Sequence, residues 1–288
     1  MDKVTCLILN YNDAVTTINM VKKIVDYKHL DNILIVDNAS TDNSYTCLVR
    51  YFNSYDNVTV INSGKNGGYG FGNNYGIKYA KSKLNAKYVI ISNPDVSFSD
   101  KLVEKLLVVL KEKDAAIVSG TQIMDKEKAD FSAWNIPTAF QWTFIETKFF
   151  RKYTTSYRYP SEYFNSDITK VACVRGAMFL VDINKFLSVG GYDEEMFLFG
   201  EETLIGYKFR QKKYATYILN KEYYYHQHST TINKNIPNLI KKEKIMQNSK
   251  LIFFKKYLRI NKLEYIFLKS VFKGKLIKMK IKGLLSSK

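Results

Sequence analysis

Short apolar runs alternate with segments of helical spacing along residues 1–120. The apolar runs are Val4–Leu9, Ile33–Val36, Val58–Ile61, Val89–Ile91 and Ala115–Ser119. Continuous apolar runs of this length are typical of strands that are buried on both faces of a sheet. The segments between them predict helices at Ala14–Tyr27, from a Thr41–Asp42 cap to Phe52, from near Asn73, and over Lys101–Glu112. The alternation predicts an α/β fold in which helices cover a mainly parallel central sheet.

The pattern is less regular over 121–170, which contains both tryptophans and a run of tyrosines. We interpret this region as the part that faces a second substrate, because aromatic rings can stack on sugars or lie against lipid. An aromatic cluster under a long loop is the equal alternative. Thr169–Val181 then predicts one strand that is interrupted at 175–177.

Two aspartates follow buried strands directly. Asp37 ends the run Ile33–Val36, and Asp95 follows the run Val89–Ile91 after the turn residue Pro94. Open α/β sheets bind ligands at the carboxyl ends of their strands, so we expect both carboxylates at one crevice. Carboxylate oxygens suit Mg2+ or Mn2+, which take only one or two carboxylates when they also bind phosphates. The alternative for both residues is an ordinary turn or capping aspartate.

A glycine-rich segment, NSGKNGGYGFGNNYG, occupies 62–76. It is no dinucleotide fingerprint, because it does not follow the first strand and no acidic residue closes a second strand about 20 residues later. The glycines allow the backbone to approach a flat or phosphorylated ligand closely, or they simply form a tight loop before a helix.

The positive charge of the chain is concentrated near its C-terminus. Of the net charge of +17, residues 241–288 contribute +13, from fifteen Lys or Arg and two Glu. We therefore divide the chain into a body at 1–235 and a basic, amphipathic helical extension at 236–288. Lysines interleaved with apolar residues suit the surface of an anionic membrane. The alternative is a helix packed on the body with a solvated basic side.

Composition narrows the setting further. Cys6, Cys47 and Cys173 are widely spaced, which indicates reduced thiols in a cytosolic protein rather than disulfides or a zinc site. The N-terminus runs straight into a strand pattern, so a cleaved secretion signal is not expected. No apolar run is long enough to span a bilayer.

Four motifs together resemble family 2 glycosyltransferases of the GT-A fold, above all the bacterial rhamnosyltransferase-like branch that builds capsule, O-antigen or cell-wall polysaccharide. The motifs are Asn10-Tyr11-Asn12, Val36–Asp42, Asn66–Gly70 and Asn93-Pro94-Asp95. The resemblance implies that Asp37 meets the nucleobase of a nucleotide-sugar and that Asp95 binds a metal on the donor diphosphate. The whole donor site that it implies comprises Asn10, Asn12, Asp37, Asn38, Asn66, Gly67, Gly68 and Asn93. Other members carry Asp-x-Asp at this metal motif, whereas here only Asp95 is acidic.

A second match is FLSVGGYDEEMFLFGEE at 186–202, which resembles the family segment that ends in an acidic pair at a helix start. The resemblance implies that Glu202, where aspartate is usual, is the base that activates the acceptor hydroxyl. Because the side chain of glutamate is longer than that of aspartate, Glu201 also stays open as the base. A further acidic residue that many members carry two positions later is replaced here by Leu204. Independently of the family, an acidic pair at a helix start is stabilised by the helix dipole, and a carboxylate in a water-poor cleft can take a proton. Simple capping of the helix is the alternative.

Two histidines, His226 and His228, end a strand-like run. Alternate residues of a strand point to opposite faces, so only one of them should enter the cleft. The resemblance implies that His226 completes the ligation of the metal, as in some members of the family. A structural histidine is the alternative.

We therefore expect an inverting, metal-dependent glycosyltransferase that uses Mn2+ or Mg2+ and a donor of the dTDP-rhamnose or UDP-hexose type. The expected acceptor is a glycan or a lipid-linked oligosaccharide, the expected location is the inner face of the cell membrane, and a homodimer is left open. A sugar-nucleotide pyrophosphorylase would need a glycine-rich, basic loop after the first strand, and Asn10–Asp13 contains neither. A nucleic-acid or other anionic-polymer binder is disfavoured, since Asp37 and Asp95 would repel phosphates without a metal.

Overall fold

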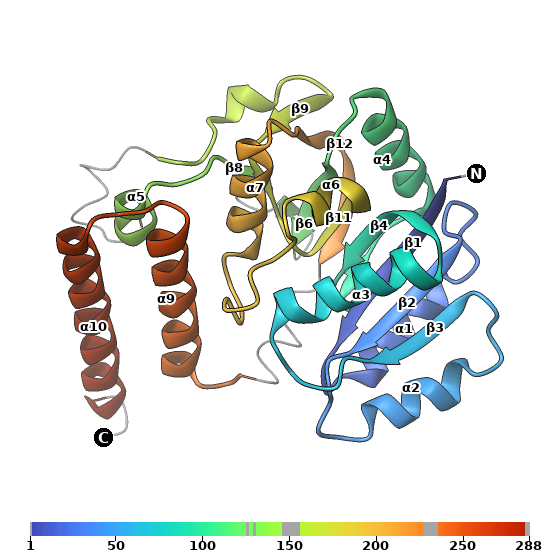
Figure 1. Ribbon diagram of the computed structural model, residues 1–288, viewed down its shortest axis with the longest axis horizontal. Coiled ribbons are helices and arrows are strands. Elements are labelled where there is room, and N and C mark those ends of the chain that lie inside the picture. Colours follow the sequence, from blue (N-terminus) through green and yellow to red (C-terminus); the bar gives the residue numbers. More distant parts are fainter. Residues whose placement is uncertain (1, 125–126, 129–130, 146–155, 227–235, 286–288) are drawn as a thin grey trace.

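A ten-stranded sheet forms the centre of the computed structural model, with strand order β3-β2-β1-β4-β11-β6-β12-β5 and with β7 and β9 attached to β6 and β12 (Figure 1). The structure describes residues 2–124, 127–128, 131–145, 156–226 and 236–285. The first four long strands are β1 (Lys3–Asn10), β2 (Asn32–Asp37), β3 (Val58–Asn62) and β4 (Ala86–Ser92). They are mutually parallel, and the register places Asn10, Asp37 and Asn62 side by side at their carboxyl ends.

Helices cover both faces of this sheet, which explains why its strands are apolar throughout. On one face, Cys6 and Ile8 of β1 pack with α1 (Ala14–Ile24), α2 (Ser44–Phe52) and α4 (Asp100–Glu112). On the other, Leu7 packs with α3 (Tyr69–Lys83), α6 (Ile183–Ser188) and α7 (Glu201–Gln211). Consecutive side chains of a strand point to opposite faces, so both sets must be apolar. The predicted helix-covered α/β sheet is confirmed.

Several boundaries predicted from the sequence are wrong. The helix expected to follow a Thr41–Asp42 cap begins at Ser44, and its N-cap is Asn43. The helix expected near Asn73 begins at Tyr69, because Gly68 at its N-cap has a φ of 91°, which an L side chain rarely adopts. The single interrupted strand expected at Thr169–Val181 is three strands with different partners: β9 (Ile168–Val171), β10 (Cys173–Val174) and β11 (Met178–Asp182). β9 pairs with β12 (Thr216–His226). β11 does not continue this pairing, but lies antiparallel between β4 and β6 (Ile117–Met124).

Smaller elements complete the part of the chain that joins the sheet to its C-terminal helices. They are β5 (Val96–Ser97), β7 (Glu127–Lys128), β8 (Ala133–Trp134), α5 (Ala139–Phe144) and the 3-10 helix η2 (Ser161–Phe164). β8 pairs with β10 outside the main sheet. The region read as irregular therefore contains several short elements.

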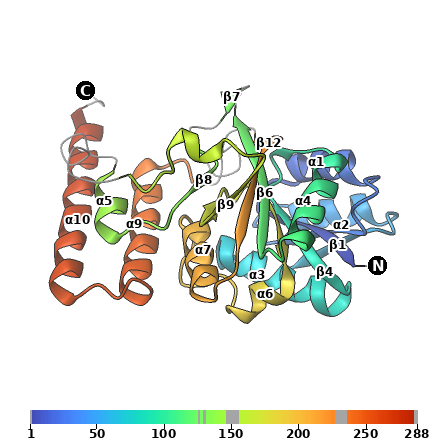
Figure 2. The same ribbon diagram turned by 90° about the horizontal axis from the view of Figure 1, so that it is seen from above.

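Two antiparallel helices, α9 (Leu239–Lys256) and α10 (Lys262–Leu285), follow the sheet. α9 packs on the body, because Phe253 and Phe254 are fully buried together with Trp134 and Leu204. α10 lies outside α9 at the edge of the molecule (Figure 2). Helices were expected here. The division at residue 235 remains a prediction, although the packing of α9 matches the alternative of a helix docked on the body. In the described part of the chain, no helix combines the length and the apolar character that a membrane crossing requires.

Candidate active site

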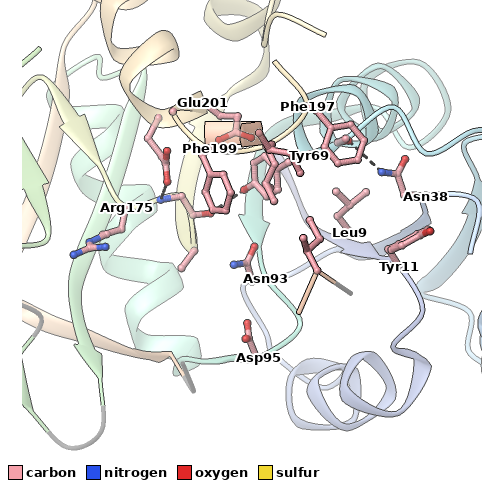
Figure 3. Close-up of a pocket in the computed structure, with 18 of the residues that line it drawn as sticks. Leu9, Tyr11, Asn38, Tyr69, Asn93, Asp95, Arg175, Phe197, Phe199 and Glu201 are labelled. Atoms are coloured by element: carbon pink, nitrogen blue, oxygen red, sulfur yellow. Dashed lines mark hydrogen bonds between the residues drawn. The ribbon is translucent and has the colours of Figure 1, made fainter. Parts of the chain in front are cut away.

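A pocket of about 440 Å³ opens at the carboxyl ends of β1, β2 and β4 (Figure 3). Several segments line it: the strand ends, the glycine-rich loop, the turn at 175–177, the loop that leads into α7, and the start of α9. A volume of this size lies in the range of small-ligand sites, and its location is where open α/β sheets bind ligands. The structure thus brings segments from both ends of the chain to one cavity.

Asp95 and His226, both predicted as metal ligands, lie at the wall of this pocket. His226 Nε2 is 3.1 Å from Asp95 Oδ1, and only 14% and 5% of the two side chains are exposed. The pair is brought together because His226, the last residue of β12, is the strand partner of Val96 in β5. Two ligand atoms bound at right angles to Mg2+ at about 2.1 Å would lie about 3.0 Å apart. The two side chains are hydrogen-bonded at this spacing, and the same spacing would let both bind a divalent ion, whose other ligands would be phosphate and water.

No cluster of three or more potential metal-binding side chains occurs in the described residues. A third ligand from the protein is not required, because Mg2+ usually keeps several waters and binds substrate phosphates alongside one or two carboxylates. His228, the other histidine considered, lies outside the described residues.

Asp37 lies behind the wall of the pocket rather than on it. Its carboxylate accepts hydrogen bonds from Asn10 Nδ2 (2.8 Å), Ser40 N (2.8 Å), Ser40 Oγ (2.7 Å) and Asn62 Nδ2 (3.4 Å). A carboxylate offers about four lone-pair sites, so these donors fill its capacity. Asn12 accepts from Thr41 N (2.8 Å) and so ties the loop after β1 to the loop after β2. Through these hydrogen bonds, Asp37 connects the carboxyl ends of β1, β2 and β3, from which the loops of the pocket begin.

The glycine-rich loop supplies the next part of the wall. Asn38 Nδ2 donates to Asn66 Oδ1 and to the carbonyl of Gly68, both at 3.1 Å, and all three residues line the pocket. A Cβ on Gly68 would lie 2.1 Å from the carbonyl oxygen of Phe197, so only glycine allows this close approach. Gly67, by contrast, faces Phe71 rather than the pocket. Asn93 also lines the cavity, opposite Glu201 in Figure 3.

The acidic pair, Glu201 and Glu202, begins α7 directly after Phe199 and Gly200, whose φ values are 72° and 91°. A left-handed conformation at Phe199 is strained for a bulky residue, and such strain is most often retained at functional sites. Both glutamates line the pocket. Glu202 Oε1 accepts a 3.3 Å hydrogen bond from Gly176 N, whereas Glu201 Oε1 is buried without a partner among the described residues.

Burial raises the pKa of both carboxyls, and the neighbouring charge of Glu202 adds to this effect at Glu201, whose pKa rises to about 8. The guanidinium of Arg175 and the N–H of Gly176 oppose the rise in the pKa of Glu202. A buried pair of carboxyls shares one negative charge more readily than it carries two. We therefore assign the proton to Glu201 and the carboxylate to Glu202, which favours Glu202 as the base.

This assignment predicts how stability depends on pH. The ordinary glutamate pKa is 4.5 and that of Glu201 is about 8, so the folded protein keeps a proton that the unfolded chain releases between these values. The free energy of unfolding should therefore fall as the pH rises from about 5 to about 8. Glutamine at 201 imitates the protonated acid, so urea unfolding of Glu201→Gln should show a flatter profile over this range. The exposed Glu112→Gln is the matched control, and an unchanged slope in Glu201→Gln would contradict the assignment.

Gly176 predicts a separate effect on catalysis. A Cβ at this position would lie 2.8 Å from Glu202 Oε1, so Gly176→Ala must displace the carboxylate. Misplacement of a catalytic group by about 1 Å can slow a reaction about a hundredfold. We expect turnover to fall by about this factor with little change in the melting temperature. Gly274→Ala, which meets nothing within 4 Å, is the control and should retain full turnover.

Several lining residues were not predicted from the sequence as site residues. Tyr69 donates from its hydroxyl to the carbonyl of Gly176 (2.8 Å), and Arg175 reaches back to the carbonyl of Phe131 (3.0 Å). Together they fix the turn that holds Glu202. The interruption at 175–177 was the visible signal, but it was interpreted as a break in a strand.

Helix α9 is the other unforeseen part of the site. Lys241 and Ile245 line the pocket, and Ser249 Oγ donates to the carbonyl of Leu198 (2.8 Å) in the loop that precedes the acidic pair. Farther along, Lys256 and Tyr257 both bond to Asp193 Oδ2, at 2.9 and 2.7 Å. α9 therefore forms one wall and also braces the loop that carries Glu201 and Glu202.

Known proteins show the same fold. The structure of GalNAc-T7 with UDP, GalNAc and Mn2+ superposes with a TM-score of 0.62 at 14% identity, covering 88% of this chain and 48% of that one. This likeness confirms the predicted GT-A fold.

Two curated relatives are similar in sequence. The low-salt glycan biosynthesis hexosyltransferase Agl10 of Haloferax volcanii is 24% identical over 212 residues, which cover 74% of this chain and 63% of the relative. An N-acetylglucosaminyl-diphospho-decaprenol L-rhamnosyltransferase of Mycobacterium tuberculosis is 27% identical over 213 residues, covering 69% and 68%. The match thus spans slightly less than two thirds of the archaeal relative.

The family model described as "Glycosyl transferase family 2" matches residues 5–179. The matched part runs from β1 into β11 and includes Asp37 and Asp95, while Glu202 and His226 follow it in the chain. It covers more than half of the sequence and contains every strand-end motif on which the resemblance depends. By this match, the chain belongs to glycosyl transferase family 2.

Proposed function

We propose that this protein is an inverting glycosyltransferase, which moves a sugar from a nucleoside diphosphate donor to a hydroxyl of a glycan or lipid-linked acceptor. The observation that carries the proposal is the meeting of two pairs at one pocket: Asp95 with His226, and Glu201 with Glu202. The first pair suits a metal–diphosphate and the second suits proton transfer. Membership of the family and the names of both curated relatives support the reaction.

The metal in this proposal is Mn2+ or Mg2+, bound by Asp95 and His226. A divalent ion there would neutralise charge on the diphosphate of the donor. The presence of UDP and Mn2+ in the GalNAc-T7 structure supports such a donor complex. Asn38, Asn66 and Gly68 line the same cavity and would contact the nucleotide.

Glu202 acts as the general base. Its carboxylate takes the proton of the acceptor hydroxyl while the oxygen of that hydroxyl attacks the anomeric carbon. The bond from this carbon to the diphosphate oxygen breaks, and its electron pair leaves with the nucleoside diphosphate. Glu201 stays protonated, and its neighbour therefore keeps the negative charge of the pair. A single displacement of this kind inverts the anomeric configuration.

The donor that we propose is of the dTDP-rhamnose or UDP-hexose type, since one curated relative is named a rhamnosyltransferase and the other a hexosyltransferase. The name of the mycobacterial relative includes a diphospho-decaprenol, which supports a lipid-linked acceptor. Capsule, O-antigen or cell-wall synthesis is the process that we assign, in the cytoplasm where nucleotide-sugars are made. A homodimer remains compatible with this reaction.

Thermal-shift measurements with UDP, dTDP and GDP, each with and without Mn2+, test the proposal. A ligand present at 100 times its dissociation constant stabilises the folded protein by about 2.7 kcal/mol. We expect one nucleotide to raise the melting temperature, and to do so more strongly with Mn2+. If neither the nucleotides nor the corresponding nucleotide-sugars raise the melting temperature, the proposed donor class is wrong.

A further inference from the structure

Helix α10 carries two apolar faces, and only one of them is covered. Its inner face packs on α9 through Leu268 and Phe272, which are 3% and 5% exposed. Its outer face presents large apolar side chains to solvent: Leu263 (80% exposed), Ile266 (51%), Ile277 (59%) and Ile281 (52%). Phe267 is also half-exposed, but its ring contacts Phe144 of α5. A helix that only packs on a body carries polar residues on the side away from it. The outer apolar residues therefore need another explanation.

These exposed residues form one continuous line along the helix. Ile277 and Ile281 follow Leu263 by 14 and 18 positions, which is close to four and five helical turns. Ser270 and Gly274 occupy the turns between them, so the line contains no charged residue. We call this set, completed by Ile266, the outer stripe.

Lysines flank the outer stripe on both sides. By helical rotation, one flank holds Lys262, Lys269, Lys273 and Lys280, and the other holds Lys278 and Lys282. Lys275 instead pairs with Glu243 of α9 (3.0 Å). Against these six cations α10 has one acidic residue, Glu264, which bonds to Asn261 at the start of the helix. An apolar stripe bordered by cations is the arrangement that binds an anionic lipid surface. A second copy of the same stripe would bring like charges together, which disfavours a dimer through this face.

We propose that the outer stripe of α10 lies on an anionic membrane, with its apolar side chains among the lipid headgroups and its lysines on their phosphates. Each Lys near such a surface contributes about 1 kcal/mol, or about a fivefold gain in partitioning. Six lysines and four apolar side chains are sufficient for reversible, salt-sensitive binding. The helix would lie along the surface rather than cross the bilayer.

The position of the pocket fits this orientation. Lys241 and Ile245 of α9 line the pocket, whereas Gln247 of the same helix bonds to the carbonyl of Phe272 in α10 (3.2 Å). α9 therefore separates the pocket from α10, and the outer stripe is roughly 20 Å from the pocket if each helix is about 10 Å wide. Figure 2 shows α9 between α10 and the sheet. A glycan that projects from a lipid headgroup could reach the pocket while the pocket itself stays in water. This part of the inference rests on the proposed function.

Co-sedimentation of the purified full-length protein with lipid vesicles tests the proposal. We expect binding to vesicles of phosphatidylcholine and phosphatidylglycerol in equal parts, weaker binding at high salt, and little binding to phosphatidylcholine alone. The variant Leu263→Ser/Ile277→Ser/Ile281→Ser should bind at least about tenfold more weakly, because buried aliphatic groups contribute about 0.8 kcal/mol per CH2. Lys269→Gln/Lys273→Gln should bind about twentyfold more weakly.

Matched controls use exposed residues far from α10. Val15→Ser/Val108→Ser removes side chains that are 70% and 46% exposed on α1 and α4, and Lys83→Gln/Lys101→Gln removes two cations from the body. Both controls should bind vesicles like the wild type. Because all substituted side chains are exposed, every variant should keep the wild-type melting temperature, which confirms that it is folded.

Two results would overturn the proposal: a wild-type protein that does not sediment with anionic vesicles, or an outer-stripe variant that sediments as well as the wild type. A dimer that dissociates in the stripe variant, without vesicle binding, would instead make the stripe a subunit interface. The nucleotide thermal shift is measured on the same variants. If it persists when vesicle binding fails, the proposed reaction stands and only the membrane surface is wrong.

Discussion

Replacement of Glu202 by glutamine is expected to slow sugar transfer by a factor of about 10²–10⁴, the usual contribution of a positioned general base. Glutamine keeps the shape of the side chain and can still meet Gly176 N, but it cannot take the proton of the acceptor. The pocket and the metal pair are unaffected, so donor binding should be unchanged. The measurement is single-turnover transfer at saturating donor, together with the thermal shift produced by the nucleotide.

Glu201→Gln is the internal control for this experiment. Because Glu201 is already protonated in our assignment, its replacement by a neutral amide should slow the chemical step much less. The reverse order of effects would move the base to Glu201. If both variants react at the wild-type rate, the start of α7 takes no part in the proton transfer.

Asp95→Asn is expected to weaken metal-dependent donor binding by a factor of about a hundred or more. A neutral amide keeps the shape of the carboxylate but loses the charge that a divalent ion requires, and such charge is worth several kcal/mol. The enhancement of the nucleotide thermal shift by Mn2+ measures this effect. We expect the enhancement to disappear in Asp95→Asn while the melting temperature without ligand stays close to that of the wild type.

The chain offers a matched aspartate–histidine pair outside the pocket. Asp100 Oδ2 lies 3.0 Å from His29 Nδ1, close to the 3.1 Å between Asp95 and His226. Asp100→Asn should therefore cause a similar local loss of a hydrogen bond but leave the effect of Mn2+ intact. Equal enhancement by Mn2+ in Asp95→Asn and wild type would refute the metal assignment.

Much of the fold could be predicted because its determinants are local. The apolar runs of β1, β2 and β4 reflect burial on both faces, and this condition is visible in any single strand. Asp37 and Asp95 were assigned to one crevice for the same reason: residues after parallel strands must meet at one edge. The insertion of β11 between β4 and β6 could not be predicted in this way. It depends on which distant strands pair, and the apolar pattern of Met178–Asp182 is equally compatible with several neighbours.

The candidate site shows the same division. Motifs indicated which residues cluster, but not which of them line the cavity. Asp37 and Asn10 lie in a hydrogen-bond network behind the lining residues, and their contact with the donor stays a prediction. Tyr69 and Gly176 meet across 107 positions in the sequence, and no local pattern encodes such a contact. Lys241 was assigned to a charged tail because its neighbours in sequence are lysines. Its place on the pocket wall results from the packing of α9.

The two roles of α9 limit how the C-terminal region can vary among homologues. α10 contacts the body mainly through α9 and α5, so exchanging α10 between relatives should alter membrane preference without altering the reaction. Exchanging α9 as well would replace Lys241 and Ile245 in the pocket and Ser249 behind the catalytic loop. Chimeric enzymes should therefore tolerate a junction at Tyr257–Asn261, between the two helices, far better than a junction before Leu239. The best junction for a chimera therefore lies within the basic extension, and not at residue 235, where the composition of the chain changes.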